Sequence, residues 1–179
     1  MKVVILAGGF GTRLSEYTDK IPKPMVEIGE FPMIEHIMNH YSNYGFKEFI
    51  LCLGYKQEII KNYFINYNLR KSDICVDLKS GKSSLLKGSQ RDWKINLIQT
   101  GFSTMTGGRV KKIRNLISED SFLLTYGDGL SNINIHKLIE FHRKKAKAIT
   151  ISAFKPQARF GELEINNGEV ESFQEKPQL

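Results

Sequence analysis

The first 25 residues bring together glycine, hydroxyl and cationic side chains in an order that suits the binding of a polyphosphate. An apolar run, Val3–Leu6, enters a glycine-rich turn at Ala7–Leu14, and a cation between two prolines follows in Pro22–Met25. Glycines let the backbone approach phosphate oxygens closely and point its N–H groups at them. Arg13 and Lys23 supply the matching positive charge. The segment therefore predicts a nucleoside triphosphate site.

The spacing of the glycines excludes two other kinds of phosphate loop. A dinucleotide-binding fingerprint needs a third glycine where Leu14 stands, and no Gly-Lys-Ser/Thr triplet closes the turn as it would in a Walker A loop. The later triplet Gly81–Ser83 lacks the preceding glycine, because that position is Val76. We interpret Ser80–Gly88 as a flexible polar loop. By itself, the first turn would also fit a tight connection between a strand and a helix.

Three further clusters carry ligand-binding chemistry. Tyr126–Gly129 places the Asp128 carboxylate directly after an apolar run. One such carboxylate, together with phosphate oxygens, suits Mg²⁺. An Asp-Gly turn that ends a strand would have the same sequence. In Gly101–Arg109 a glycine pair lets the backbone approach a ligand, or the segment is a loop and a helix N-cap. Glu175–Pro177 offers a carboxylate and an ammonium to a sugar phosphate, and would also fit a surface turn.

Strand-like runs alternate with helix-like runs, which indicates an α/β fold with a largely parallel sheet. The expected strands are Val3–Leu6, Glu48–Leu53, Ile74–Leu78, Ile95–Gln99, Phe122–Thr125, Ile149–Phe154, Glu162–Ile165 and Val170–Phe173. The expected helices are Met33–Tyr44, Gln57–Phe64, Gly108–Ile117 and Ile135–Ala146. Asn166–Gly168 suits a hairpin turn between the last two strands. We expect a single domain, residues 1–179, that binds ligands at the carboxyl ends of its strands.

Composition narrows the class of protein further. The 179 residues are 41% hydrophobic and 25% charged, which is ordinary globular material, and no apolar run approaches the length of a membrane span. Residues 1–6 hold one lysine and an apolar run that leads straight into the glycine motif, so we expect no signal peptide. Cys52 and Cys75 lie in apolar strand-like segments, so we expect buried, reduced thiols and a cytoplasmic location. The formal charge of +7 is scattered over helix-like segments, which favours solvated helix faces over nucleic-acid binding.

Together, the motifs give the chain a family resemblance. The strings L-A-G-G-F-G-T-R-L at 6–14 and P-K-P-M at 22–25 resemble the signature of the sugar-nucleotide pyrophosphorylases. The strings S-T-M-T-G-G-R at 103–109, T-Y-G-D-G at 125–129 and S-F-Q-E-K-P at 172–177 resemble those of the glucose-1-phosphate cytidylyltransferases among them. The resemblance runs from Met1 to the last residues. One departure is Ile21, where some members carry a lysine, but Lys23 is retained.

This resemblance implies a Rossmann-like three-layer nucleotidyltransferase fold with a mostly parallel mixed sheet. It also implies Mg²⁺-dependent transfer of CMP from CTP to α-D-glucose 1-phosphate, for nucleotide-sugar and surface polysaccharide synthesis. In such a reaction Arg13 would take the leaving pyrophosphate, Lys23 would act at the α-phosphate and Asp128 would hold Mg²⁺. The implied nucleotide-binding positions are Leu6, Ala7, Gly8, Gly9, Gly11, Thr12, Arg13, Lys23, Thr104, Met105, Gly107, Arg109, Gly127 and Asp128. The implied sugar-phosphate positions are Glu175 and Lys176.

The attacking sugar phosphate is already an anion, so no general base is needed and we assign no histidine to catalysis. Members of the family continue beyond the position of Leu179, with sugar-binding loops, a second metal-binding aspartate and elements of a homo-oligomer interface, which we expect this chain to lack. Three alternatives stay open. They are a sister enzyme for another nucleotide or sugar, a non-catalytic nucleotide-binding fragment, and a basic RNA-binding domain. The last ranks lowest, because the usual aromatic and basic RNA-binding motifs are missing.

Overall fold

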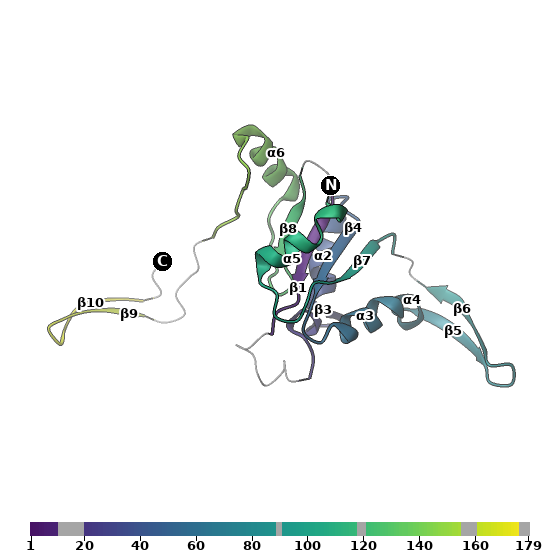
Figure 1. The fold of residues 1–179 in the computed structure, drawn as a ribbon. Coiled ribbons are helices and arrows are strands. Elements are labelled where there is room, and N and C mark those ends of the chain that lie inside the picture. Colours follow the sequence, from purple (N-terminus) through teal and green to yellow (C-terminus); the bar gives the residue numbers. More distant parts are fainter. Residues whose placement is uncertain (11–19, 89–90, 118–120, 155–160, 176–179) are drawn as a thin grey trace. The chain divides into compact units, whose positions relative to one another are not determined.

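The structure is a computed structural model that describes residues 1–10, 20–88, 91–117, 121–154 and 161–175 (Figure 1). The chain divides into two compact units, Met1–His136 and Lys137–Leu179. The first unit holds the main sheet and the helices packed on it, and the second holds a small hairpin. Each unit is described by itself below.

A four-stranded parallel sheet in the order β7-β4-β1-β8 forms the centre of the first unit. Its strands are β1 (Val3–Ala7), β4 (Glu48–Leu53), β7 (Lys94–Gln99) and β8 (Leu123–Tyr126). All five residues of β1 are buried, as a central strand covered on both faces requires, which explains its unbroken apolar sequence. This confirms the predicted α/β fold and parallel sheet, and it brings the carboxyl ends of all four strands to one edge.

Helices cover both faces of this sheet, with α5 in front of β1 and α2 behind it in Figure 1. The helical elements of the unit are η2 (Lys23–Met25), α2 (Met33–Asn43), α3 (Gln57–Ile65), α4 (Tyr67–Arg70), α5 (Thr106–Lys112) and η3 (Arg114–Leu116). On one face, Ile113, between α5 and η3, packs with side chains from β1 and β4, namely Val4, Leu6, Ile50 and Cys52. The segment predicted as one helix, Gly108–Ile117, is therefore two short helical pieces joined at a buried isoleucine.

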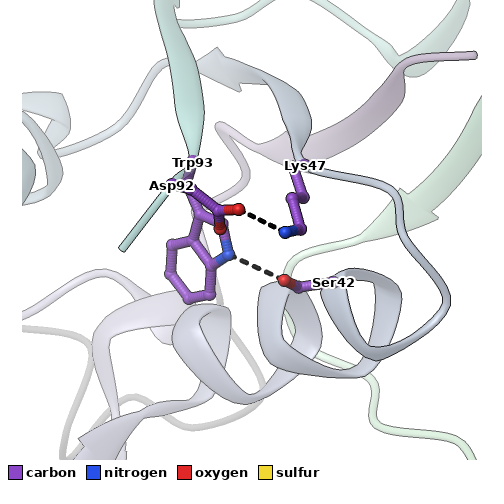
Figure 2. Close-up of polar contacts among 4 residues, drawn as sticks. All are labelled: Ser42, Lys47, Asp92 and Trp93. Carbon is purple, nitrogen blue, oxygen red and sulfur yellow. Dashed lines mark hydrogen bonds and ion pairs between the residues drawn. The ribbon is translucent and has the colours of Figure 1, made fainter. Parts of the chain in front are cut away.

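Polar contacts fix the start of β7 against its neighbours (Figure 2). The Trp93 indole Nε1 donates a hydrogen bond to Ser42 Oγ on α2 at 3.0 Å, and Lys47 forms an ion pair with Asp92. The Trp93 ring also packs edge-on against Phe49 of β4, with ring centroids 5.7 Å apart. These contacts hold β7 in register beside β4, and so set where the loop after β7 begins.

A buried carboxylate joins the helices behind the sheet. Glu35 of α2 is fully buried, and the hydroxyls of Tyr63 and Tyr67 both donate hydrogen bonds to it, the latter at 2.8 Å. Burial, and then the neighbouring Glu35, raises the pKa of Tyr63 above its usual value. The two hydroxyls satisfy a carboxylate that would otherwise be costly to bury.

The prediction that Ser80–Gly88 is a flexible loop is wrong. Strand β6 (Lys82–Gly88) pairs in antiparallel fashion with β5 (Ser72–Asp77), and the turn between them is capped by Asp77, which accepts hydrogen bonds from Lys79 N and Ser80. Backbone pairing gives these polar residues a strand conformation that their side chains do not signal. Cys75 lies on this exposed hairpin, so the prediction that it is buried is also wrong, whereas Cys52 is buried as expected.

Two short strands, β2 (Glu27–Ile28) and β3 (Phe31–Pro32), form a further antiparallel pair in the first unit. Helix α6 (Ile135–Lys145) begins at the end of this unit and continues into the second.

The second unit contains the antiparallel hairpin of β9 (Glu162–Asn166) and β10 (Glu169–Gln174). Its turn matches the prediction, since Asn167 and Gly168 both have positive φ, 50° and 87°. Residues 149–154 were expected to form a strand, but they have no strand assignment, and this prediction is wrong. A strand needs a neighbour to complete its hydrogen bonds, and none of the described strands pairs with this segment.

Candidate active site

A pocket of about 230 Å³ lies where the loops after β1, β7 and β8 meet. Its position at the carboxyl edge of a parallel sheet is where open α/β folds bind ligands. The residues that line it are Leu6, Ala7, Gly8, Gly9, Phe10, Lys23, Pro24, Phe102, Ser103, Thr104, Met105, Thr106, Arg109, Tyr126 and Asp128. The glycine turn after β1, the segment Gly101–Arg109 and the segment Tyr126–Gly129 thus each contribute residues to one cavity.

Two of the three charged groups that the sequence assigned to catalysis, Lys23 and Asp128, lie against each other in this pocket. Lys23 Nζ donates a hydrogen bond to Asp128 Oδ2 at 2.8 Å, although 105 positions separate them in the chain. Lys23 stands at the start of η2, whose next two residues, Pro24 and Met25, are buried and anchor the turn. Both charged side chains remain partly exposed, at 27% and 37%, so an incoming ligand can reach them.

Asp128 supplies chemistry that fits a magnesium ion bound together with a phosphate ligand. Mg²⁺ is usually held by one or two carboxylates, with phosphate oxygens and water filling the other positions. Within the part of the chain that the structure describes, no group of three or more His, Cys, Asp or Glu side chains is arranged to hold a metal. Among the described residues that line the pocket, Asp128 offers one carboxylate to such a cation.

Arg109 also lines the pocket, but its surroundings differ from those of Lys23. Its side chain is only 5% exposed. The guanidinium donates hydrogen bonds to backbone carbonyls at the end of β4 and just after β1 and β7, and to one hydroxyl. The acceptors are Gly8 O (2.9 Å), Leu53 O (3.0 Å), Gly101 O (2.9 Å), Phe102 O (3.3 Å) and Thr100 Oγ1 (2.7 Å). One side chain thus ties together the ends of three strands.

Two glycines make the space that this guanidinium fills. A Cβ atom on Gly8 would lie 2.2 Å from Arg109 Nη1, and one on Gly54 would lie 2.7 Å from the same atom. Neither position can carry a side chain while Arg109 keeps its bonds. The glycine after β1 therefore serves internal packing as well as close approach to a ligand.

Burial around Arg109 shifts two pKa values. Burial raises the pKa of the Cys52 thiol to about 11, with Arg109 opposing this in part, and burial lowers the pKa of Arg109, with Cys52 opposing. At neutral pH Cys52 is a protonated thiol. It is therefore not a nucleophile for the pocket.

Lys112, the last residue of α5, holds the loop that follows β7. Lys112 Nζ donates to Thr100 O at 2.8 Å and to Thr104 Oγ1 at 3.4 Å, while the Met105 side chain is 81% exposed. Lys112 was not among the predicted site residues. Its contact is to the backbone and to a hydroxyl, which a charge pattern in the sequence does not reveal.

The predicted site residues fall into three groups. Those that line the pocket are Leu6, Ala7, Gly8, Gly9, Lys23, Thr104, Met105, Arg109 and Asp128. Gly107 and Gly127 are described but do not line it, and Glu175 lies in the second unit. Those that lie outside the described residues are Gly11, Thr12, Arg13 and Lys176. Gly127 instead packs on Pro24 and Leu6, because a Cβ there would lie 3.0 Å from Pro24 Cγ and 3.1 Å from Leu6 O.

Sequence reasoning missed the aromatic side of the pocket. Phe10 and Phe102 line the cavity and contact each other edge to face, with ring centroids 4.8 Å apart. Tyr55, in the turn after β4, packs on both, at 5.5 Å from Phe10 and 5.9 Å from Phe102. Each phenylalanine stands next to a glycine in a segment that the sequence had already singled out. That position was the one sequence signal that could have indicated them.

Comparison with known proteins agrees with this geometry. The sequence matches the family model described as Nucleotidyl transferase over residues 2–179. It is 48% identical over 178 residues to the glucose-1-phosphate cytidylyltransferase of Salmonella typhimurium, covering 99% of this chain and 69% of that relative. It is 45% identical over 176 residues to the probable glucose-1-phosphate cytidylyltransferase of Bacillus subtilis, covering 98% of this chain and 69% of that relative.

A solved structure has the same fold. The chain superposes on HddC from Yersinia pseudotuberculosis, crystallised with GMP-PN, with a TM-score of 0.67 and 27% identity, over 99% of this chain and 70% of that one. The family model, the close relatives and the parallel sheet with its edge pocket all point the same way. The chain belongs to the nucleotidyl transferase family, among the relatives of the glucose-1-phosphate cytidylyltransferases.

Proposed function

We propose that this chain transfers CMP from CTP to α-D-glucose 1-phosphate, releasing pyrophosphate and forming CDP-glucose. The observation that carries the proposal is the pairing of Lys23 with Asp128 inside the edge pocket. These are the cation and the carboxylate that an in-line transfer at the α-phosphate requires. The similarity to cytidylyltransferases supports the choice of base and sugar.

In this reaction an oxygen of the sugar phosphate forms a bond to the α-phosphorus of CTP. The bond from that phosphorus to the oxygen bridging to the β-phosphate breaks, and pyrophosphate leaves with the electron pair. No proton has to be removed from the nucleophile, so catalysis consists of alignment and charge neutralisation. Lys23 neutralises charge at the α-phosphate, and the backbone of Gly8 and Gly9 positions the nucleotide. Arg13, Glu175 and Lys176 keep the roles that the resemblance implies, on the leaving pyrophosphate and the sugar phosphate.

We also propose Mg²⁺ as the cofactor, with Asp128 as its protein ligand. When bound, the cation would offset the negative charge of the phosphates. The chain's own contribution is to hold the carboxylate at the end of β8. There Gly127 N donates to Leu6 O at 2.9 Å and fixes the backbone before Asp128. Lys23 would then bind the α-phosphate and Asp128 the cation, so each group would gain a partner of opposite charge.

The setting of the reaction is part of the same proposal. In the part of the chain that the structure describes, no helix is long and apolar enough to cross a membrane. Cys52 and Cys75 are both free thiols, which supports a reducing, cytoplasmic location. We propose that the product feeds nucleotide-sugar and surface polysaccharide synthesis, and that the protein does not act on nucleic acid.

Equilibrium binding of a nucleotide panel tests the proposal. CTP, UTP, dTTP, GTP and ATP would each be titrated into the chain with Mg²⁺ and again with EDTA. The expected result is tightest binding of CTP, weakened when Mg²⁺ is removed, because the phosphates then lose their counter-charge. Tighter binding of GTP or another nucleotide would assign the chain to a sister enzyme, and salt-sensitive RNA binding without nucleotide binding would contradict the proposal.

A further inference from the structure

A second cavity, of about 480 Å³, lies beside the η2 turn in the first unit. Consecutive residues of the chain line different cavities here. Lys23 and Pro24 line the active-site pocket, whereas Met25 and Val26 line the second cavity. The two cavities share no described lining residue. The second cavity has the size of a small-molecule site, and nothing in the proposed mechanism uses it.

The lining of this cavity combines an apolar wall with two opposite charges. The apolar wall is formed by Ile21, Met25, Val26, Pro32 and Ile59. Glu27 of β2 and Arg70 at the end of α4 also line the cavity, and both residues are exposed. Among the described residues, neither side chain forms an ion pair with the other or with a third residue. Both the carboxylate and the guanidinium can therefore pair with a ligand.

Tyr63 gives the cavity a fixed aromatic surface. Its side chain is 8% exposed, and its hydroxyl donates a hydrogen bond to the buried Glu35 carboxylate, which also accepts one from Tyr67. The ring cannot leave this position without breaking a buried hydrogen bond. The Arg70 guanidinium lies over the ring, with its central carbon 5.6 Å from the ring centroid. The cation is therefore positioned before a ligand arrives, which reduces the entropy lost on binding.

We propose that this cavity binds a small zwitterion with an apolar body, the chemical class of the amino acids with large apolar side chains. The acidic group of the ligand pairs with Arg70 and its ammonium group pairs with Glu27. Its apolar body packs against the apolar wall and Tyr63. A ligand with one charge leaves Glu27 or Arg70 without a partner. A polyphosphate would bring several negative charges close to Glu27, so the lining selects against it.

The η2 turn connects this cavity to the active-site pocket. Met25 N donates to Pro22 O at 2.8 Å, and Val26 N donates to Lys23 O at 3.1 Å. The residues that line the two cavities thus belong to one hydrogen-bonded turn, and a ligand packed on Met25 and Val26 restrains Lys23 as well. A restrained Lys23 loses less conformational freedom when a phosphate binds. Occupancy of the second cavity should therefore tighten nucleotide binding.

The test uses three probes that carry the same ring and differ in charge, namely L-phenylalanine, phenylpropionate and phenethylamine. Each is titrated into the chain labelled with ¹³C-methyl methionine. We expect L-phenylalanine to bind most tightly and to shift the methyl signal of Met25, in the second cavity. The signal of Met105, in the active-site pocket, should change little. No probe contains a phosphate, so this result does not depend on the proposed function.

Two variants that each remove one charge separate the roles of Arg70 and Glu27. Arg70→Gln should weaken the binding of L-phenylalanine and phenylpropionate at least about fivefold, without weakening phenethylamine. Glu27→Gln should weaken L-phenylalanine and phenethylamine by a similar factor, without weakening phenylpropionate. Both residues are exposed, so the variants should remain folded. Arg114→Gln and Glu30→Gln remove exposed charges outside the cavity and are the matched controls.

The connection through η2 is tested by titrating CTP and Mg²⁺ into the chain with and without saturating L-phenylalanine. CTP should bind at least about twofold more tightly when the second cavity is occupied. Unchanged CTP affinity would overturn the connection, and absence of all CTP binding would overturn the connection and the proposed function but not the second site. No shift of Met25 with any probe, or equal effects of the variants and their controls, would overturn the second site itself.

Discussion

At the scale of single residues, the pocket contains two kinds of cation in different surroundings. Lys23 is 27% exposed and pairs with a carboxylate that an incoming ligand can reach, so its charge is available to a phosphate. Arg109 is 5% exposed, and its guanidinium donates hydrogen bonds to carbonyls of the protein's own backbone. Substitution of the first should therefore affect the reaction, and substitution of the second should affect the folded structure.

Lys23→Ala should lower the rate of pyrophosphate release by about 10²–10³, the usual effect of removing one contact that stabilises charge in the transition state. The free energy of unfolding should change little, because the side chain is partly exposed and surface ion pairs contribute little. Steady-state kinetics and urea unfolding of the same preparation measure both. A turnover near that of the unsubstituted enzyme would remove Lys23 from the proposed mechanism.

Arg109→Lys should destabilise the chain by at least about 2 kcal/mol, because an ammonium cannot reach all the carbonyls that the guanidinium fork binds, and buried acceptors are left unsatisfied. Urea unfolding measures the change. Arg114→Lys is the control, since Arg114 is exposed and should tolerate the same exchange. Equal stability of the Arg109 and Arg114 variants would contradict the role assigned to the buried guanidinium.

The sequence singled out the two paired charged residues of the pocket, but not all of the residues that surround them. Lys23 and Asp128 lie in motifs whose composition suits phosphate and metal, and the structure brings them to 2.8 Å. The five bonds of Arg109 could not be predicted, because four of its acceptors are backbone carbonyls, which every residue possesses. Phe10 and Phe102 were missed because their contact needs the folded arrangement of two loops 92 positions apart in the sequence.

At the scale of elements, β1 is the strand on which the site depends. It pairs with β4 on one side and β8 on the other, and it leads directly into the glycine turn of the pocket. The β5–β6 hairpin differs from it, since most of its residues are exposed. Truncation of a similar apolar side chain should therefore cost more unfolding free energy in β1 than in the β5–β6 hairpin.

Ile5→Ala should cost about 2–5 kcal/mol of unfolding free energy, because Ile5 is fully buried in β1 and its removal leaves a cavity. Ile74→Ala in β5 is the matched control. Ile74 is 44% exposed, so the same truncation should cost less than about 1 kcal/mol. Denaturant unfolding of the two variants measures the difference. Similar losses in both would contradict the assignment of β1 to the core.

The elements that could be predicted were those with a strong apolar pattern. β1 and, after the exposed Glu48, β4 are apolar runs because they are covered on both faces, and α2 shows helical spacing of its buried side chains. β6 was missed because its strand conformation comes from pairing with β5 and not from its own polar residues. Residues 149–154 gave the opposite error, since their apolar, β-branched pattern suits a strand, yet no described strand pairs with them.

At the scale of the whole molecule, the order of the strands organises the function. Four strand ends lie along one edge of the sheet, with aromatic rings after β7, β4 and β1 and the carboxylate after β8. In the proposed function, a bound nucleotide has its phosphates at Lys23 and Asp128. The parallel sheet and the edge site could be predicted from the alternation of strands and helices. Which side chains lie at each end of the pocket could be learned only from the order of the strands.

The most direct test of the account is pyrophosphate release by the purified chain with Mg²⁺ and glucose 1-phosphate, supplied in turn with CTP, UTP, dTTP, GTP or ATP. We predict release with CTP that depends on glucose 1-phosphate and on Mg²⁺, and much slower release with the other four nucleotides. Preferential release with a different nucleotide, or none with CTP despite CTP binding, would contradict the proposed cytidylyl transfer.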